Sequence, residues 1–158
     1  MKKALILFLA ALFFVSFYSC SRQPKVGDIS RQAVINRAVS FDGELQTAAE
    51  NFAKSYISMK YPNQTLPFKG SSKITETPVL NTGSEIKSFC LTYNVKAGDS
   101  VSDDVVILFY ELSGTYYLTG FLTPKELSEA SDLDRFLYDY FKADSRITAM
   151  IPEYPDAK

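Results

Sequence analysis

No histidine occurs among the 158 residues, and its absence limits the chemistry that the chain can perform. Histidine is the usual general base at neutral pH and a common metal ligand, so Ser-His-Asp triads, Cys-His pairs and imidazole metal sites are excluded. The seven glycines are scattered singly, and neither the dinucleotide nor the nucleotide phosphate-loop pattern can be written with them. Carboxylates remain as the acid–base groups to consider.

Three pairs of carboxylates stand close together in the chain, and each has a structural explanation. They are Asp103 with Asp104, Glu126 with Glu129, and Asp132 with Asp134. The first pair ends a polar loop, the second favours the positive end of a helix dipole, and the third can cap a helix. A glycosidase-like pair needs burial to raise one pKa, and no sequence feature indicates such burial. We therefore predict no catalytic residue, no metal and no cofactor, with a carboxylate-dependent hydrolase as the alternative.

Aromatic side chains gather in two segments of the C-terminal half. Tyr110, Tyr117 and Phe121 lie on a predicted hairpin, and four more rings follow at helical spacing between residues 136 and 141. This spacing favours packing of the rings into a core between the hairpin and a helix. The alternative is a groove for a ligand or peptide, lined by the three hairpin residues, because tyrosine suits amphipathic interfaces.

The first twenty residues have the layout of an export signal. Lys2 and Lys3 are followed by an uncharged run over residues 4–18 and then by Ser19 and Cys20. At helical rise the uncharged run reaches only ~22 Å, which is short for a hydrocarbon core of ~30 Å. The pattern predicts a signal peptide over residues 1–19 in preference to a transmembrane helix.

Residues 17–20 read Phe-Tyr-Ser-Cys, and this segment resembles the lipobox of bacterial lipoprotein precursors. The resemblance implies that Cys20 receives diacylglycerol through its sulfur and that a peptidase cuts just before it. Phe17 and Tyr18 depart from the usual Leu and Ala, Ser or Thr, so the lipobox is a loose one. The alternative is an ordinary signal-peptidase cut at a small-x-small site, for which residues 19–21 are the poorer candidate. By resemblance to enterobacterial sorting, Ser21 favours the outer membrane in a cell that has two.

The charge of the mature chain restricts its partners. The whole chain has 17 basic and 18 acidic residues, and loss of Lys2 and Lys3 with the signal changes the net charge from −1 to −3. Nucleic acid is not an expected partner, because no basic stripe is present. The sequence therefore predicts a lipid-anchored cell-envelope protein whose single domain is a non-catalytic module that binds an envelope protein or a small ligand, partner unknown.

Cys90 is the only other cysteine. Strand alternation places it on a face with Ser88, Thr92 and Asn94, which would expose it. A free thiol is a hazard in an oxidising compartment, and the neighbouring hairpin is apolar on both faces, which implies cover on both sides. We expect Cys90 to be largely buried and inert.

Helical patterns occur in two parts of the chain. Residues 20–41 are predicted to be a tether with a short helix over 30–39, and residues 42–61 a longer helix, capped by Asp42 and stopped by Pro62. Its apolar stripe consists of Leu45, Ala48, Ala49, Phe52, Ala53, Tyr56 and Ile57. A final helix begins with a Thr123 cap, Pro124 and Glu126, and could restart after a break at residues 131–134.

Four antiparallel strands are expected over residues 73–80, 85–95, 104–112 and 115–122, with Pro78 placing the first strand at an edge. If residues 113–114 form a two-residue turn, the predicted pairs are Tyr110 with Tyr117, Phe109 with Leu118, Leu108 with Thr119, Ile107 with Gly120, and Val106 with Phe121. Both faces of this hairpin are apolar, so each must be covered or one must be a binding groove.

The predicted fold is α+β: an N-terminal helix, a four-stranded antiparallel sheet and a C-terminal helix, in one domain over residues 42–151 with a frayed tail over 152–158. This order of elements resembles the cystatin-like and nuclear transport factor 2-like families. The resemblance implies a helix packed against one side of a curved antiparallel sheet.

The lipid anchor yields the first testable prediction. Cys20→Ala should abolish acylation, because the thioether that carries the acyl chains cannot form, and the protein should be left unprocessed or released. Metabolic labelling with a palmitate analogue measures this, with Cys90→Ala as the matched control. Equal labelling of the wild type and Cys20→Ala would exclude lipidation at Cys20.

Overall fold

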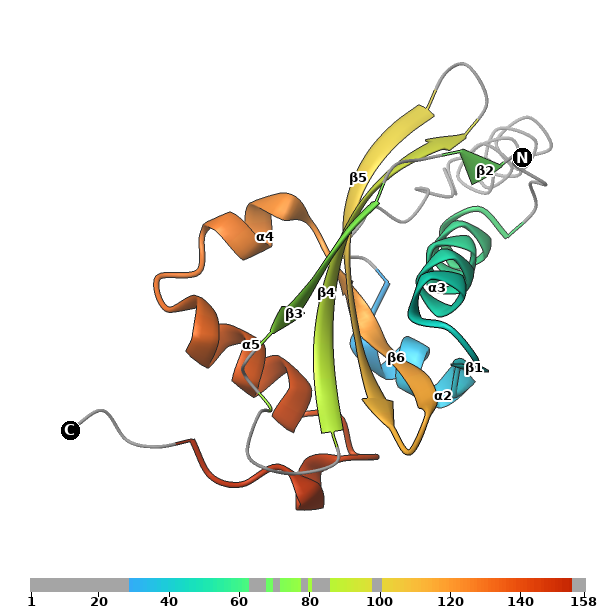
Figure 1. Cartoon of the computed structure of the whole chain (residues 1–158). Coiled ribbons are helices and arrows are strands. Elements are labelled where there is room, and N and C mark those ends of the chain that lie inside the picture. The colour runs from blue at the N-terminus through green and yellow to red at the C-terminus, as the bar shows by residue number, and fades with distance from the viewer. Residues whose placement is uncertain are drawn as a thin grey trace, which may run out of the picture.

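The computed structural model describes residues 29–62, 68–69, 72–77, 80, 86–97 and 101–154 (Figure 1). The predicted signal peptide, Cys20 and residues 155–158 lie outside this part of the chain. Within it, no helix is long and apolar enough to cross a membrane.

One antiparallel sheet forms the centre of the α+β fold. The described residues contribute six strands to it: β1 (Ser40–Asp42), β2 (Phe68–Lys69), β3 (Ser72–Thr77), β4 (Ile86–Ala97), β5 (Val101–Leu112) and β6 (Thr115–Leu122). The order is β1-β6-β5-β4-β2, and β3 also pairs with β4. The strands β3 to β6 overlap the four predicted ones, but the predicted four-stranded sheet is wrong, because the short β1 and β2 also pair into it. The strand β5 begins at Val101, so Asp103 and Asp104 lie within a strand and not at the end of a loop. The position of β3 at an edge agrees with the prediction from Pro78, which is itself outside the described residues.

The helices of the described residues are α2 (Arg31–Arg37), α3 (Leu45–Lys60), α4 (Pro124–Ser128) and α5 (Leu133–Lys142), and α5 is followed by a 3-10 turn, η2 (Thr148–Met150). The predicted capping box of Thr123 and Glu126 begins α4, and Asp132 caps α5 after the predicted break. The predicted cap at Asp42 is wrong. Asp42 ends β1, where its Oδ1 accepts a hydrogen bond of 2.6 Å from the Thr115 hydroxyl, and α3 begins after Glu44.

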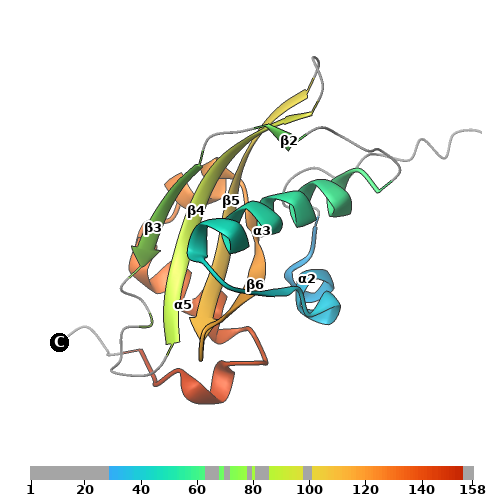
Figure 2. The same cartoon turned by 45° about the vertical axis from the view of Figure 1, so that its right-hand side comes forward.

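Helices cover both faces of the sheet, as the apolar hairpin required (Figures 1 and 2). The helix α3 lies on one face and α5 on the other. The buried core on the α3 face includes Ala49, Phe52, Ala53, Tyr56, Phe89, Leu91, Ile107, Phe109, Leu118 and Phe121. The core on the α5 face includes Val106, Leu108, Tyr110, Leu122, Leu137, Tyr138, Phe141, Ile147 and Ile151. The prediction that both faces are covered is confirmed.

The chain segment before α3 is part of the packed domain. Val34 on α2 is completely buried in the α3-side core, and the Val39 carbonyl accepts a hydrogen bond of 3.0 Å from the Leu118 N–H. The short helix predicted over residues 30–39 is present, with Ser30 as its cap. Residues 31–41 therefore belong to the domain and not to the predicted tether.

The start of the predicted tail also contacts the domain. The Tyr138 hydroxyl donates to the Pro152 carbonyl at 2.6 Å, and the rings of Tyr138 and Tyr154 lie 4.8 Å apart. Residues 152–154 are thus held against α5.

The hairpin of β5 and β6 begins in the predicted register. Ser113 and Gly114 form the two-residue turn, with φ of 53° and 83°, a conformation typical of tight hairpins. Tyr110 lies opposite Tyr117 and Phe109 opposite Leu118, as predicted.

A β-bulge then shifts the register between Leu108 and Phe109, and the predicted pairs beyond it are wrong. The observed pairs are Leu108 with Gly120, Ile107 with Phe121, and Val106 with Leu122. The extra residue in β6 is Thr119. Because side chains alternate between faces, one inserted residue moves Phe121 from the predicted face of Tyr110 and Tyr117 to the α3 face.

Close packing of α5 against the sheet depends on Gly120. A Cβ atom at this position would lie 2.1 Å from the Tyr140 hydroxyl oxygen and about 3 Å from its ring. The Tyr140 main-chain carbonyl accepts a hydrogen bond of 2.9 Å from Arg31, whose guanidinium lies 4.7 Å from the ring centroid. Tyr140 thereby joins α5 to both β6 and α2.

The core assignment predicts the effect of truncating Phe52. Phe52→Ala should lower the free energy of unfolding by about 3–5 kcal/mol, because a buried aromatic side chain leaves a cavity. Glu50→Ala, on the exposed side of the same helix, is the control and should change it little. Urea denaturation of both variants measures the difference, and comparable losses would contradict the assignment.

Candidate functional site

The three residues proposed as a groove do not come together. Tyr110 and Phe121 are 1 % and 2 % exposed, and they lie on opposite faces of the sheet because of the bulge. Tyr110 stacks on the half-buried Tyr117 with ring centroids 5.2 Å apart, whereas Phe121 contacts Tyr56 at 5.1 Å. These aromatic side chains are core residues, which was the favoured interpretation of their spacing.

A buried ion pair supports the bulge. Asp144 is 0 % exposed and receives hydrogen bonds from Arg146 Nε at 2.9 Å and Nη2 at 2.6 Å. The same Nη2 donates to the Leu118 carbonyl at 2.6 Å, and the Thr119 hydroxyl donates to Asp144 at 3.3 Å. The ion pair on the segment after α5 therefore forms hydrogen bonds with the Leu118 carbonyl and the Thr119 hydroxyl. These groups lie at the bulge, where the ladder of backbone hydrogen bonds between β5 and β6 is interrupted.

The Arg146 guanidinium also faces the stacked tyrosines. Its Cζ lies 5.7 Å from the Tyr110 ring centroid and 6.0 Å from that of Tyr117, within the range of a cation–π interaction. The buried Nη1 has no hydrogen-bond partner among the described residues. Burial raises the pKa of Tyr110 to about 12, so its hydroxyl is protonated at neutral pH and does not supply a general base.

A second buried polar cluster lies at the C-terminal end of α3. The Lys60 ammonium, on a side chain that is 8 % exposed, is ion-paired with Asp103 Oδ2 on β5 and donates to the Tyr56 hydroxyl at 3.0 Å. The Tyr61 hydroxyl donates to the same Asp103 oxygen at 2.9 Å. Burial, with a contribution from Asp103, raises the pKa of Tyr56, and burial and the hydrogen bond to Asp103 raise that of Tyr61 to about 12. Both tyrosines are thus neutral hydrogen-bonding groups at neutral pH.

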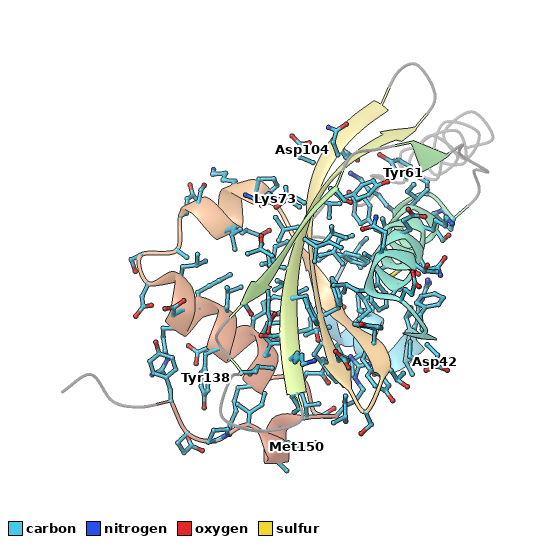
Figure 3. All side chains as sticks on the ribbon, in the orientation of Figure 1. Asp42, Tyr61, Lys73, Asp104, Tyr138 and Met150 are labelled. Carbon is cyan, nitrogen blue, oxygen red and sulfur yellow. The ribbon has the colours of Figure 1, made fainter. Side chains whose placement is uncertain are left out.

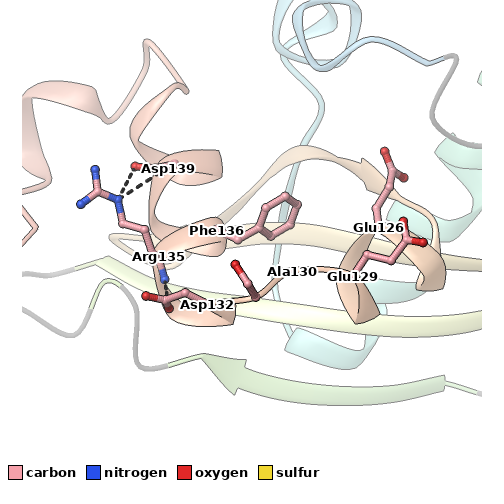
Figure 4. A pocket seen from close by; sticks show the side chains of 8 residues that line it. Glu126, Glu129, Ala130, Asp132, Arg135, Phe136 and Asp139 are labelled. Carbon is pink, nitrogen blue, oxygen red and sulfur yellow. Dashed lines mark hydrogen bonds and ion pairs between the residues drawn. The ribbon is translucent and has the colours of Figure 1, made fainter.

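The described surface has a shallow depression of about 500 Å³ between α4 and α5 (Figure 4). Its lining residues are Glu126, Glu129, Ala130, Ser131, Asp132, Arg135, Phe136 and Asp139. Four carboxylates and one guanidinium give this lining a net charge of −3. The Phe136 ring adds an apolar surface between the two acidic groups of residues.

Two of these carboxylates begin helices. Glu126 Oε2 accepts from the backbone N–H and the hydroxyl of Thr123, at 2.7 and 2.8 Å. Asp132 Oδ1 accepts from the Arg135 N–H at 2.9 Å. Helix capping is the structural role that the sequence predicted for Glu126 and for Asp132.

The other two carboxylates form exposed ion pairs. Asp139 accepts from Arg135 Nε through both oxygens at 3.1 Å, and Glu129 lies 3.6 Å from Lys125. All four carboxylates of the depression are exposed to solvent. The depression can therefore attract a cation, but it lacks a buried carboxyl of the kind that a glycosidase uses as its acid.

Cys90 is half-buried on the α5 face, beside Leu108 in the next strand. Burial raises the pKa of its thiol to about 11, so the reactive thiolate is a minor form at neutral pH. The alternation of β4 is as predicted, with Phe89, Leu91 and Tyr93 in the opposite core.

Sequence reasoning missed both buried ion pairs. Lys60 lies four residues after Tyr56 and so continues the apolar stripe of α3, which is a local signal for its burial. Its partner Asp103 is 43 residues away. Asp144 and Arg146 lie just before the buried Ile147 in the sequence. Their role in bonding to the bulge could not be foreseen, because the bulge itself was not predicted.

Comparisons with known proteins identify no relative. No protein-family model matches the chain, and neither a curated protein nor a solved structure gives a significant match. Among the described residues, no group of three or more His, Cys, Asp or Glu side chains is placed to hold a metal ion.

The buried pair at the bulge yields a stability prediction. Asp144→Ala should lower the free energy of unfolding by about 3–5 kcal/mol, because it leaves the Arg146 guanidinium without its carboxylate. Asp139→Ala removes a carboxylate from an exposed Asp–Arg pair and should have a much smaller effect. Thermal or urea unfolding compares the two variants. Similar losses would show that the Asp144 pair does not stabilise the bulge.

Proposed function

We propose that this protein is held on a membrane of the cell envelope by lipid on Cys20, and that its domain is a non-catalytic binding module. The anchor is supported by the export-signal layout of the sequence over residues 1–19 and by the resemblance of residues 17–20 to a lipobox. Ser21 favours the outer membrane if the cell has two. The partner of such a module is an envelope protein or a small ligand.

The depression between α4 and α5 is the observation that carries the binding proposal. It combines a concave surface, a lining charge of −3 and the Phe136 ring. An ammonium or guanidinium group with an aliphatic or aromatic neighbour suits this combination, because the carboxylates attract the cation and the ring contacts its apolar part. The module therefore favours a cationic ligand or a basic segment of another envelope protein.

A carboxylate-dependent hydrolase is the second candidate. Acid–base catalysis by two carboxylates requires that their environments separate their pKa values. The lining carboxylates are open to solvent, and two of them cap helices. The buried carboxylate of Asp144 and the partly buried one of Asp103 each pair with a cation and belong to opposite sides of the sheet. These features favour binding over hydrolysis.

We also propose a structural analogy to the cystatin-like and nuclear transport factor 2-like families. A helix, α3, followed by the antiparallel strands β3 to β6 against which it packs, supports the analogy. The second helical layer of α4 and α5 and the added strands β1 and β2 are features of this chain that the simple order of elements does not include.

Charge reversal tests the binding surface. Glu129→Lys should reduce recovery of a partner cross-linked to the protein in intact membranes, because it changes the charge of the depression by two units. Glu76→Lys makes the same change on the exposed side of β3 and is the matched control. Quantitative mass spectrometry of the cross-linked products measures recovery, with circular dichroism to verify that both variants are folded.

Equal recovery with Glu129→Lys, Glu76→Lys and the wild type would contradict the proposed surface. A hydrolase would behave differently: a conservative Glu129→Gln or Asp139→Asn change would abolish turnover of an envelope polymer while leaving partner recovery intact. Loss of activity of that kind would replace the binding proposal.

A further inference from the structure

Residues 151–154, which we call the C-terminal arm, run back along α5. The side chain of Ile151 is buried in the α5-side core. The Tyr138 hydroxyl donates to the Pro152 carbonyl at 2.6 Å, and Lys142 Nζ donates to the Ile151 carbonyl at 2.5 Å. Figure 3 shows Tyr138 on the α5 side of the sheet, beside this segment. The arm is thus attached to one stripe of α5 by its main chain.

The arm also places an aromatic ring on Arg135. The Tyr154 ring meets the Tyr138 ring edge-on at 4.8 Å, and the Arg135 Cζ lies 4.9 Å from the Tyr154 centroid and 5.9 Å from that of Tyr138. Both distances are within the range of a cation–π interaction. Arg135 Nε also donates to the two oxygens of Asp139 at 3.1 Å. One guanidinium is therefore held by a carboxylate and two rings.

The Tyr154 ring is the part of this cradle that α5 does not supply. The side chains of Arg135 and Asp139 are 50 % and 58 % exposed. Such an exposed pair contributes little by itself, because it must hold two flexible side chains in one geometry in water. The ring from the arm adds a contact on the guanidinium that comes from outside the helix. The position of Arg135 therefore depends on the arm.

Arg135 contributes the positive charge to the lining of the depression between α4 and α5. Figure 4 shows it paired with Asp139 at one end of the depression, with Phe136 between this end and the lining glutamates. The chain's own guanidinium thus compensates the carboxylate of the Asp139 end. At the other end Glu129 lies 3.6 Å from Lys125, beyond the usual length of a hydrogen bond, and both side chains are exposed. The two ends of the depression therefore differ in how firmly their carboxylates are paired.

On the basis of the proposed binding function, we propose that Tyr154 is a positioning residue of the binding surface. It holds the Arg135 guanidinium on Asp139 and thereby directs a cationic ligand to the glutamate end of the depression, beside Phe136. The chain already uses a carboxylate and aromatic rings to hold a guanidinium at the Asp139 end. A ligand of the same chemistry enters that end only by displacing Arg135.

Side-chain NMR of the full-length protein in detergent tests the positioning without a ligand. In Tyr154→Leu the Arg135 Nε proton should exchange with water about two- to fivefold faster than in the wild type, because one exposed cation–π contact is lost. Tyr154→Phe keeps the ring and is the matched control, which should exchange at the rate of the wild type. Circular dichroism verifies that both variants are folded. Equal rates in Tyr154→Leu and the wild type, or the same acceleration in Tyr154→Phe, would overturn the proposal.

Titration with butylguanidinium tests where a cation binds. In the wild type the largest amide shifts should fall at Glu129 and Phe136, and Tyr154→Leu should add shifts at Asp139, because the probe then competes with Arg135 for this carboxylate. Shifts at Asp139 of equal size in both proteins would overturn the proposal. Absence of shifts at every lining residue in both proteins would instead contradict the proposed binding surface, and the exchange rates would still decide whether Tyr154 holds Arg135.

Discussion

The structure depends on one constraint, that the hairpin of β5 and β6 is apolar on both faces. Ile107 and Phe109 point to one side of β5, and Val106 and Leu108 to the other. A sheet of this kind cannot leave a face in water, so the chain must supply a layer on each side. The helix α3 provides one layer, and α5 with the segment that follows it provides the other. The remaining polar interactions act at the places where these layers meet the sheet.

Two buried ion pairs occupy such places, one on each side. Asp144 and Arg146 connect the α5 side to the carbonyl of Leu118 at the bulge, and Lys60 connects the end of α3 to Asp103. Each pair connects a helix end, or the segment after a helix, to a strand of the sheet. Their charged groups are largely withdrawn from water and therefore need hydrogen-bond partners. The exposed carboxylates are distributed differently, since those of α4 and α5 gather around a concave surface.

The elements that could be predicted are those with local causes. The stripe of α3, the capping box at Thr123 and the turn at Ser113 and Gly114 each depend on residues a few positions apart, and all three are present. The bulge at Thr119 could not be predicted, because its support comes from Asp144, 25 residues further on. The misplacement of Phe121 followed from that omission alone. Asp42 failed as a cap for a similar reason, since pairing with β6 directs it to Thr115.

The contact between Gly120 and Tyr140 has a consequence for how this sequence can vary. The hydroxyl of Tyr140 occupies the space that any side chain at position 120 would need. These two positions, twenty residues apart, therefore share one volume, so a side chain at position 120 requires the Tyr140 ring to move or a shorter residue at position 140. A library randomised at both positions would therefore return pairs in which a larger residue at 120 is matched by a shorter one at 140. The sizes of the residues at positions 120 and 140 would then vary in opposite directions, because together they fill the space between α5 and the sheet.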